Sequence, residues 1–209
     1  MDHLIYILFV SVFVPILLMA CLIEKKARQP IIFVLIGIFA SVFAAEVNGL
    51  LRGLLPMSAY EITIIVTPIS EEILKAVPIL VFATVLGARK EALFTASMAV
   101  GIGFAVLENA YYLLNDASFS MIDAIIRAFG AGLMHGMCTL LVGVGISFVK
   151  TKKKVFVVGT FALLSTAITY HGIYNMLVQS DYTVIGVLLP VATYIPFVVW
   201  RLKKKTKST

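Results

Sequence analysis

Ionisable side chains lie in the middle of the most apolar stretches of this sequence. Residues 67–78 read Thr-Pro-Ile-Ser-Glu-Glu-Ile-Leu-Lys-Ala-Val-Pro, with Glu71, Glu72 and Lys75 at their centre. Later apolar stretches carry further groups of this kind: Glu108, Arg127, His135 and His171. A charged side chain at the centre of a membrane-spanning helix costs about 2.5–3.5 kcal/mol on insertion scales. Such groups must therefore face one another or an enclosed wet cavity, and a functional role is the default interpretation.

Carboxylates and imidazoles are the side chains best suited to activating a water molecule near neutral pH. A glutamate acts as general base, and a histidine orients groups or relays protons. Glu71 precedes Lys75 by four residues, which is the favourable order for an ion pair on a helix. Glu72 points about 100° away from Glu71 and is left for another partner. The spacing thus predicts a Glu71–Lys75 pair, with Glu71 or Glu72 as the base.

Small residues surround the other ionisable groups and favour close helix packing. Two glycine pairs stand out: Gly101 and Gly103 before Glu108, and Gly132 and Gly136 on either side of His135. Further along, His171 and Asn175 are four residues apart and share one helix face. An imidazole and a carboxamide side by side could donate hydrogen bonds to a developing oxyanion.

The composition identifies the lipid bilayer as the environment of the chain. Of its 209 residues, 61% are hydrophobic and only 13% are charged, whereas soluble domains carry about 25% charged residues. Crossing the hydrocarbon core takes about 20 apolar residues. Stretches of suitable length lie at 4–23, 31–51, 60–86, 92–114, 122–149, 155–178 and 183–200. The sequence predicts an all-α polytopic membrane protein with seven transmembrane helices, forming a single integral membrane domain over residues 1–209.

The basic residues alternate between the two sides of these spans. They cluster at 24–30, 87–91 and 150–154 and again from residue 201, which all lie on one side if there are seven spans. The positive-inside rule then places the C-terminus in the cytoplasm and the N-terminus outside. Topology thus accounts for the basic residues, and no nucleic-acid partner is expected. Cys21 and Cys138 fall inside apolar stretches and are expected to be buried, inert thiols.

Depth in the membrane indicates one shared site. With a rise of about 1.5 Å per residue, Glu71, Glu108, His135 and His171 all fall between the midplane and the outer third of the bilayer. We therefore expect these side chains to converge on one cavity that opens toward the outside.

Four ordered motifs resemble those of a known family. They are residues 70–75 (Ser-Glu-Glu-Ile-Leu-Lys), 103–109 (Gly-Phe-Ala-Val-Leu-Glu-Asn), His135, and 171–175 (His-Gly-Ile-Tyr-Asn). Together they resemble the PrsW family of bacterial intramembrane proteases, which is related to the CAAX prenyl endopeptidases and, more distantly, to the scaffold subunit of γ-secretase. The last motif ends in Asn175, where that family often has Asp and the CAAX relatives accept Asn.

The resemblance implies a multi-pass protein of the bacterial plasma membrane. It would make the site-1 cleavage of a single-span, anti-sigma-factor-like membrane protein near the outer face. Our first hypothesis is a metal-independent glutamate-type protease without cofactor. The predicted catalytic residues are Glu71, Glu72, Glu108, His135 and His171, supported by Lys75, Asn109, Arg127 and Asn175. In this hypothesis His171 and Asn175 hold the oxyanion, and Lys75 and Arg127 balance charge.

Other functions remain open at this point. A zinc metalloprotease would use Glu108, His135 and His171 as ligands and Glu72 as base, although no single-helix His-Glu-x-x-His motif is present. A proton-coupled transporter would also bury Glu and His side chains, but the chain has no internal repeat of the kind common in such carriers. A non-catalytic scaffold, as in the γ-secretase relative, is the last alternative.

Overall fold

A computed structural model describes residues 3–115 and 120–206, and its regular structure there is entirely helical. Six long helices are α1 His3–Leu22, α2 Lys25–Leu54, α5 Lys90–Asn115, α6 Met121–Ile146, α7 Lys153–Val178 and α8 Thr183–Thr206. The remaining span is built from three consecutive pieces: α3 Ala59–Glu61, the π-helical segment η1 Ile62–Val66, and α4 Thr67–Thr84. The predicted all-α class and seven helical passes agree with this arrangement.

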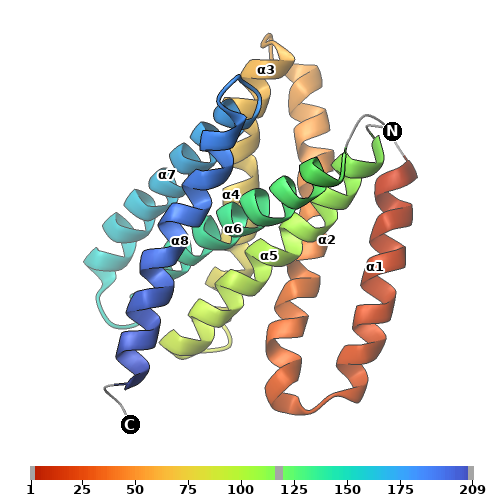
Figure 1. The fold of residues 1–209 in the computed structure, drawn as a ribbon. Coiled ribbons are helices and arrows are strands. Elements are labelled where there is room, and N and C mark those ends of the chain that lie inside the picture. The colour runs from red at the N-terminus through yellow and green to blue at the C-terminus, as the bar shows by residue number, and fades with distance from the viewer. Residues whose placement is uncertain (1–2, 116–119, 207–209) are drawn as a thin grey trace.

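Successive passes run in opposite directions, as Figure 1 shows. Five helices are long and apolar enough to cross a membrane: α1, α2, α5, α6 and α7. In α4 the three charged residues Glu71, Glu72 and Lys75 lower the hydropathy, and in α8 the described apolar part is only Thr183–Pro196. Which end of the bundle faces the cytoplasm stays a prediction.

Two predicted helix boundaries are wrong. Residues 25–30 were expected in a loop, but α2 begins at Lys25 and contains Pro30. Pro30 is the sixth residue of α2, so it removes one backbone hydrogen bond from the second turn, and the helix continues through it. At the far end of α6, the helix stops at Ile146 instead of residue 149, and a turn follows. The side chains of the basic cluster from residue 201 onward lie outside those that the structure describes.

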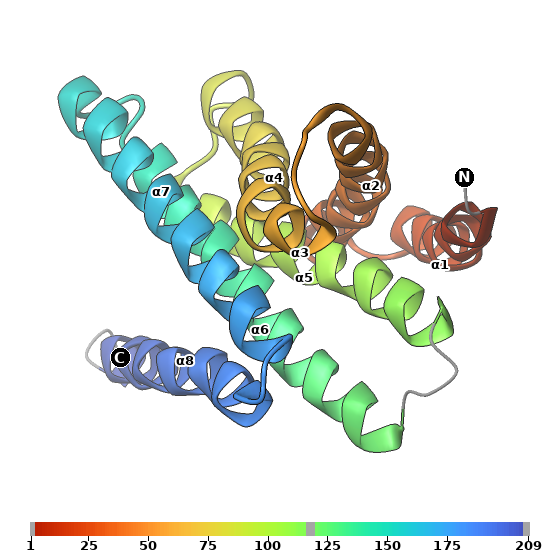
Figure 2. The ribbon, with the colours of Figure 1, turned by 90° about the horizontal axis from the view of Figure 1, so that it is seen from above.

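The centre of the bundle is formed by α5 and α6. α5 packs against α1, α2, α4 and α6, and α6 packs against α4, α5, α7 and α8. Figures 1 and 2 show α1 at one edge beside α2 and α8 at the opposite edge beside α7. Large apolar side chains such as Phe39, Val77 and Phe161 are exposed on the outside, which suits a surface in contact with lipid.

Glycines set how closely the central helices approach. A Cβ atom added to Gly103 would lie 2.1 Å from the backbone oxygen of Val34 in α2, and one added to Gly101 would lie 2.3 Å from that of His135 in α6. The predicted close packing around these two glycines is confirmed. For Gly132 the prediction is wrong, because no heavy atom lies within 4 Å of an added Cβ. A Cβ added to Gly101 would also lie 2.8 Å from the Cα atom of Gly136, so α5 and α6 each supply a glycine where they cross.

The π-helical segment interrupts the third span just before the ionisable residues. The N–H of Thr67 donates to the carbonyl of Ile62 instead of that of Thr63, and Pro68 has no N–H to offer. The carbonyl of Thr63 instead accepts a hydrogen bond from Asn175 Nδ2 of α7 at 3.0 Å. Gly172 lies against the carbonyl of Ile64, 2.7 Å from an added Cβ. This interruption lets α7 approach closely enough to bring His171 next to α4.

Candidate active site

The centre of the site is a fully buried ion pair within α4. Lys75 Nζ lies 2.6 Å from Glu72 Oε1, and neither side chain is exposed to solvent. The predicted Glu71–Lys75 pair is therefore wrong. Glu71 instead accepts a hydrogen bond of 3.2 Å from Asn48 Nδ2 of α2. A lysine reaches partners three or four residues back equally well, so the neighbouring helices decide which carboxylate it meets.

His171 of α7 binds the same carboxylate from the other side. Its Nδ1 lies 2.9 Å from Glu72 Oε1, and a carboxylate only accepts, so Nδ1 carries the proton. The other ring nitrogen, Nε2, lies 3.9 Å from Glu71 Oε2, which is buried and has no hydrogen-bond partner. That distance is too long for a direct hydrogen bond. A third group is needed to connect Glu71 with His171.

His135 of α6 links Lys75 to a third carboxylate. Lys75 Nζ lies 2.7 Å from His135 Nδ1, and because an ammonium can only donate, Nδ1 is the acceptor. His135 Nε2 therefore carries the proton and donates to Glu108 Oε2 of α5 at 2.6 Å. The ring centroids of His135 and His171 are 4.9 Å apart. A continuous chain of contacts thus joins α5, α6, α4 and α7.

The supporting residues predicted from sequence lie around this chain of contacts. Arg127 stacks its guanidinium over the ring of Tyr112, 4.2 Å from the centroid. Asn109 Nδ2 donates to the backbone oxygen of Arg127 at 3.2 Å and so holds α5 against α6. Asn175 donates to the backbone of η1 rather than facing the same space as His171. Asn109 and Asn175 thus each link two elements of the bundle through a side chain to backbone hydrogen bond.

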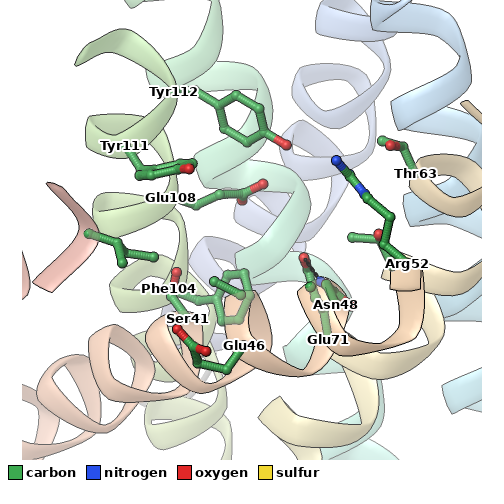
Figure 3. Close-up of a pocket in the computed structure, with 14 residues that line it drawn as sticks. Ser41, Glu46, Asn48, Arg52, Thr63, Glu71, Phe104, Glu108, Tyr111 and Tyr112 are labelled. Carbon is green, nitrogen blue, oxygen red and sulfur yellow. Dashed lines mark hydrogen bonds between the residues drawn. The ribbon is translucent and has the colours of Figure 1, made fainter. Parts of the chain in front are cut away.

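Two adjoining hollows lead to the buried groups. One, of about 360 Å³, is lined by Glu71 and Asn48 among others, and a second, of about 530 Å³, is lined by His135 and Arg127 among others. Both are lined by Arg52, Thr63, Thr67, Glu108 and Tyr112. Figure 3 shows Glu71 and Glu108 reaching the smaller hollow from different helices, with Arg52 and Tyr112 beside them. Glu72 and His171 line neither hollow and lie behind these residues.

The hollows lie toward one end of the bundle. Arg52 is in the last turn of α2, Gln179 follows α7, and Thr183 begins α8. In Figure 1 this end carries the α2–α3 and α7–α8 connections, opposite the connections that hold the basic residues. Under the predicted topology, the hollows open toward the outside.

Sequence reasoning missed the residues of α2 and η1 that complete the site. Ser70 Oγ donates to Asn48 Oδ1, which orients the carboxamide so that its Nδ2 donates to Glu71. Thr63 and Arg52 line both hollows. The signal that could have found Asn48 is a carboxamide within a mostly apolar span, since buried polar groups require a partner.

The same residues can hold a divalent metal ion. Donor atoms of Glu71, His135 and His171 all lie within 4.8 Å of one another, and all three side chains are buried. One carboxylate and two imidazoles form a familiar ligand set for catalytic zinc. Each histidine also has a carboxylate on one nitrogen, Glu72 for His171 and Glu108 for His135, as is usual for metal ligands.

Binding of an ion would change the contacts of one histidine. His135 contacts Lys75 with one nitrogen and Glu108 with the other, so it would exchange one of these partners for the ion. Lys75 would still be paired with Glu72. The residues therefore fit a metal ion. The carboxylate ligand is Glu71, whereas the sequence predicted Glu108 for that role.

Comparison with known proteins agrees with these observations. The model of the family described as PrsW family intramembrane metalloprotease matches residues 25–201, from the first turn of α2 into α8. No curated protein and no solved structure matches the chain. The matched region contains all the ionisable residues of the site, and the family's activity is that of a peptidase. This chain is a multi-pass membrane protein that belongs to the PrsW family of intramembrane proteases.

Proposed function

We propose that this protein hydrolyses a peptide bond of a single-span membrane protein, and that Glu71, His135 and His171 hold a divalent metal ion during the reaction. The observation that carries the proposal is the convergence of these three donors within 4.8 Å. They converge beside hollows lined by Glu108. When bound, such an ion polarises the scissile carbonyl and activates the attacking water.

Glu108 is the proposed proton acceptor. Its Oε2 is held by His135 Nε2, while 19% of the side chain is exposed toward the hollows. The oxygen of water bonds to the carbonyl carbon, and its proton passes to Glu108. The carbon–nitrogen bond then breaks as Glu108 gives a proton to the leaving nitrogen. The products are one new carboxylate end and one new amine end.

Glu72 and Lys75 are proposed to position the histidines. Glu72 fixes the tautomer and orientation of His171, and Lys75 contacts both Glu72 and His135. Neither residue lines a hollow, so we assign them no contact with substrate. We therefore propose a positioning role for Glu72 in place of the alternative in which Glu72 is the base.

A metal-independent glutamate mechanism is the second candidate, and one observation favours it. Both nitrogens of His135 already have partners, Lys75 and Glu108, without an ion. In this mechanism Glu71 Oε2 is the base, and water lies between it and His171 Nε2 across the separation of 3.9 Å.

The substrate class follows from where the hollows open. A peptide bond next to the outer end of a single transmembrane helix could reach Glu71 and Glu108 from that end of the bundle. An anti-sigma-factor-like protein cleaved at this position is the substrate that the family resemblance implies. Cleavage would then occur near the outer membrane face.

A chelation experiment separates the two mechanisms. The purified protein is reconstituted with a single-span substrate, dialysed against a chelator, and then supplied with Zn²⁺. We expect cleavage to fall by about 10²-fold or more and to return with zinc. We also expect mass spectrometry to find about one metal ion per chain. Glu71→Gln and His171→Ala should lower this metal content, and Glu91→Gln should leave it unchanged.

Full activity after removal of all metal would favour the glutamate mechanism. Absence of cleavage under every condition, with a folded protein and several single-span substrates, would contradict the proposed peptidase site itself.

A further inference from the structure

Two arginines stand where the hollows meet. Arg52, in the last turn of α2, lines both hollows, and Arg127 of α6 lines the larger one. The guanidinium of Arg127 is held over the ring of Tyr112 at 4.2 Å. Figure 3 shows Arg52 and Tyr112 turned toward the same space, beside Glu108. Two cations therefore flank the approach to the reacting groups.

The carboxylates nearest these arginines already have other partners. Glu108 accepts from His135, and Glu71 accepts from Asn48. Among the described side chains, neither Arg52 nor Arg127 forms an ion pair within 4.0 Å. Arg127 Nε is buried and has no hydrogen-bond partner. The guanidinium groups thus keep donors that pair with none of the described carboxylates.

The lining of the larger hollow indicates the chemical class of that ligand. Guanidinium groups pair with carboxylates through two parallel hydrogen bonds and bind them more specifically than lysine does. Neutral polar groups and apolar walls complete the lining: Thr63, Asn175, Gln179, Met134 and Val178. A volume of about 530 Å³ accommodates a few side chains of a peptide. A short carboxylate side chain and its neighbours fit these properties.

We infer that Arg52 and Arg127 form a specificity subsite that binds an acidic side chain of the substrate, a few residues to the outer side of the scissile bond. This inference rests on the proposed peptidase function. Extended peptides advance about 3.3 Å per residue, so a group bound at the arginines lies within a few residues of a bond held at Glu108. Because the arginines share their hollow with Glu108 and His135, a peptide that reaches the site also passes them.

Matched substrates test this inference. Three single-span reporter proteins carry outer flanking segments that differ only in two adjacent positions, with Asp-Glu, Asn-Gln or Lys-Lys. They are cleaved by the reconstituted protein in phosphatidylcholine vesicles. We expect the acidic substrate to be cleaved about tenfold faster than the amide substrate, because one hydrogen bond between charged groups stabilises binding by about that factor. The basic substrate should be the slowest.

Variants of the arginines supply the matched controls. Arg52→Gln should bring the ratio of acidic to amide cleavage close to one. Arg127→Gln should do the same, and Arg127→Lys should retain part of the preference because it keeps the charge. If Arg127→Gln does not fold, the exposed Arg52 still provides the test. Glu91→Gln, at the opposite end of α5, should leave the ratio unchanged.

The possible outcomes separate the two proposals. Equal cleavage of all three substrates by the parent overturns the subsite and leaves the peptidase function standing. No cleavage of any substrate contradicts the peptidase function. A rate that rises on adding phosphatidylglycerol, depends on the arginines and ignores substrate charge would identify a lipid phosphate as the occupant and overturn the subsite.

Discussion

At the scale of single residues, the site is a set of charges that satisfy one another inside the membrane. Lys75 contacts Glu72 and His135, Glu72 also contacts His171, and His135 also contacts Glu108. Such a network avoids the cost of an isolated buried charge. Glu71 Oε2 has no hydrogen-bond partner, and Glu71 lines the smaller hollow.

Glu71→Gln should abolish cleavage without unfolding the protein. The amide oxygen of Gln can still accept the hydrogen bond from Asn48, but the side chain can no longer hold a metal ion as a carboxylate or act as a base. We expect a loss of about 10²–10⁴-fold in rate, with an unchanged unfolding midpoint. Glu61→Gln is the control, because Gln also maintains the capping box with Ser58. Normal cleavage by Glu71→Gln would contradict our placement of the site.

Glu72→Gln should instead act through stability. It leaves the ammonium of Lys75, which is 0% exposed, without its carboxylate, and breaking a buried pair from one side costs about 3–5 kcal/mol. The double variant Glu72→Gln with Lys75→Met removes both charges and should recover most of this loss. Denaturant unfolding of the three proteins measures the difference. Equal stability of the single and double variants would contradict a destabilising effect of the unpaired Lys75 ammonium.

At the scale of elements, backbone features place the reacting side chains. Gly101 brings α5 against the backbone of α6 at His135. His135 is the residue that donates to Glu108. Pro68 and the π-helical segment free carbonyls that Asn175 and Gly172 of α7 approach. π-helical segments often occur at functional sites, and here the segment allows His171 to reach Glu72.

Gly101→Ala should disturb both packing and catalysis. Its Cβ would lie 2.3 Å from the backbone oxygen of His135, so the two helices must separate. Overpacking of this kind costs about 1–3 kcal/mol, and the displaced His135 should lower cleavage as well. Gly132→Ala on α6 is the matched control, because nothing lies within 4 Å of its added Cβ. Unfolding midpoints and cleavage rates that are the same in both variants would contradict a role for this close contact.

At the scale of the whole molecule, the bundle places its hollows at one end and its described basic connections at the other. The hollows involve the ends of α2 and α7, whereas the basic connections follow α1, α4 and α6. If the basic residues face the cytoplasm, as the positive-inside rule predicts, the proposed reaction takes place toward the outside. Orientation thus decides which part of a substrate the enzyme meets.

Reporter fusions test this orientation. An enzyme that is active only outside the cytoplasm is fused after Asn115, Asp181, Lys90 or Lys153. Fusions after Asn115 and Asp181 should be active, and those after Lys90 and Lys153 should be silent, because the positive-inside rule places the latter two in the cytoplasm. The reverse pattern would place the hollows on the cytoplasmic side and contradict outer-face cleavage.

The sequence by itself determined the environment, the number of helical passes and the ionisable residues that meet in the bundle. Apolar length and the alternation of basic residues depend only on the local chain, so they are visible without a structure. The cost of burying charge singled out Glu71, Glu72, Glu108, His135 and His171 for the same reason. The order of the motifs also indicated the family, which the match over residues 25–201 confirms.

Only the tertiary structure decided which of these groups meet. Lys75 could pair with Glu71 or Glu72 by spacing alone, and contacts from Asn48 of α2 and His171 of α7 accompany its pairing with Glu72. Asn175 has a backbone carbonyl as its partner because of an irregular segment more than 100 residues earlier. Helical periodicity determines the face on which a side chain lies, whereas the rotation and offset of neighbouring helices depend on how their surfaces pack.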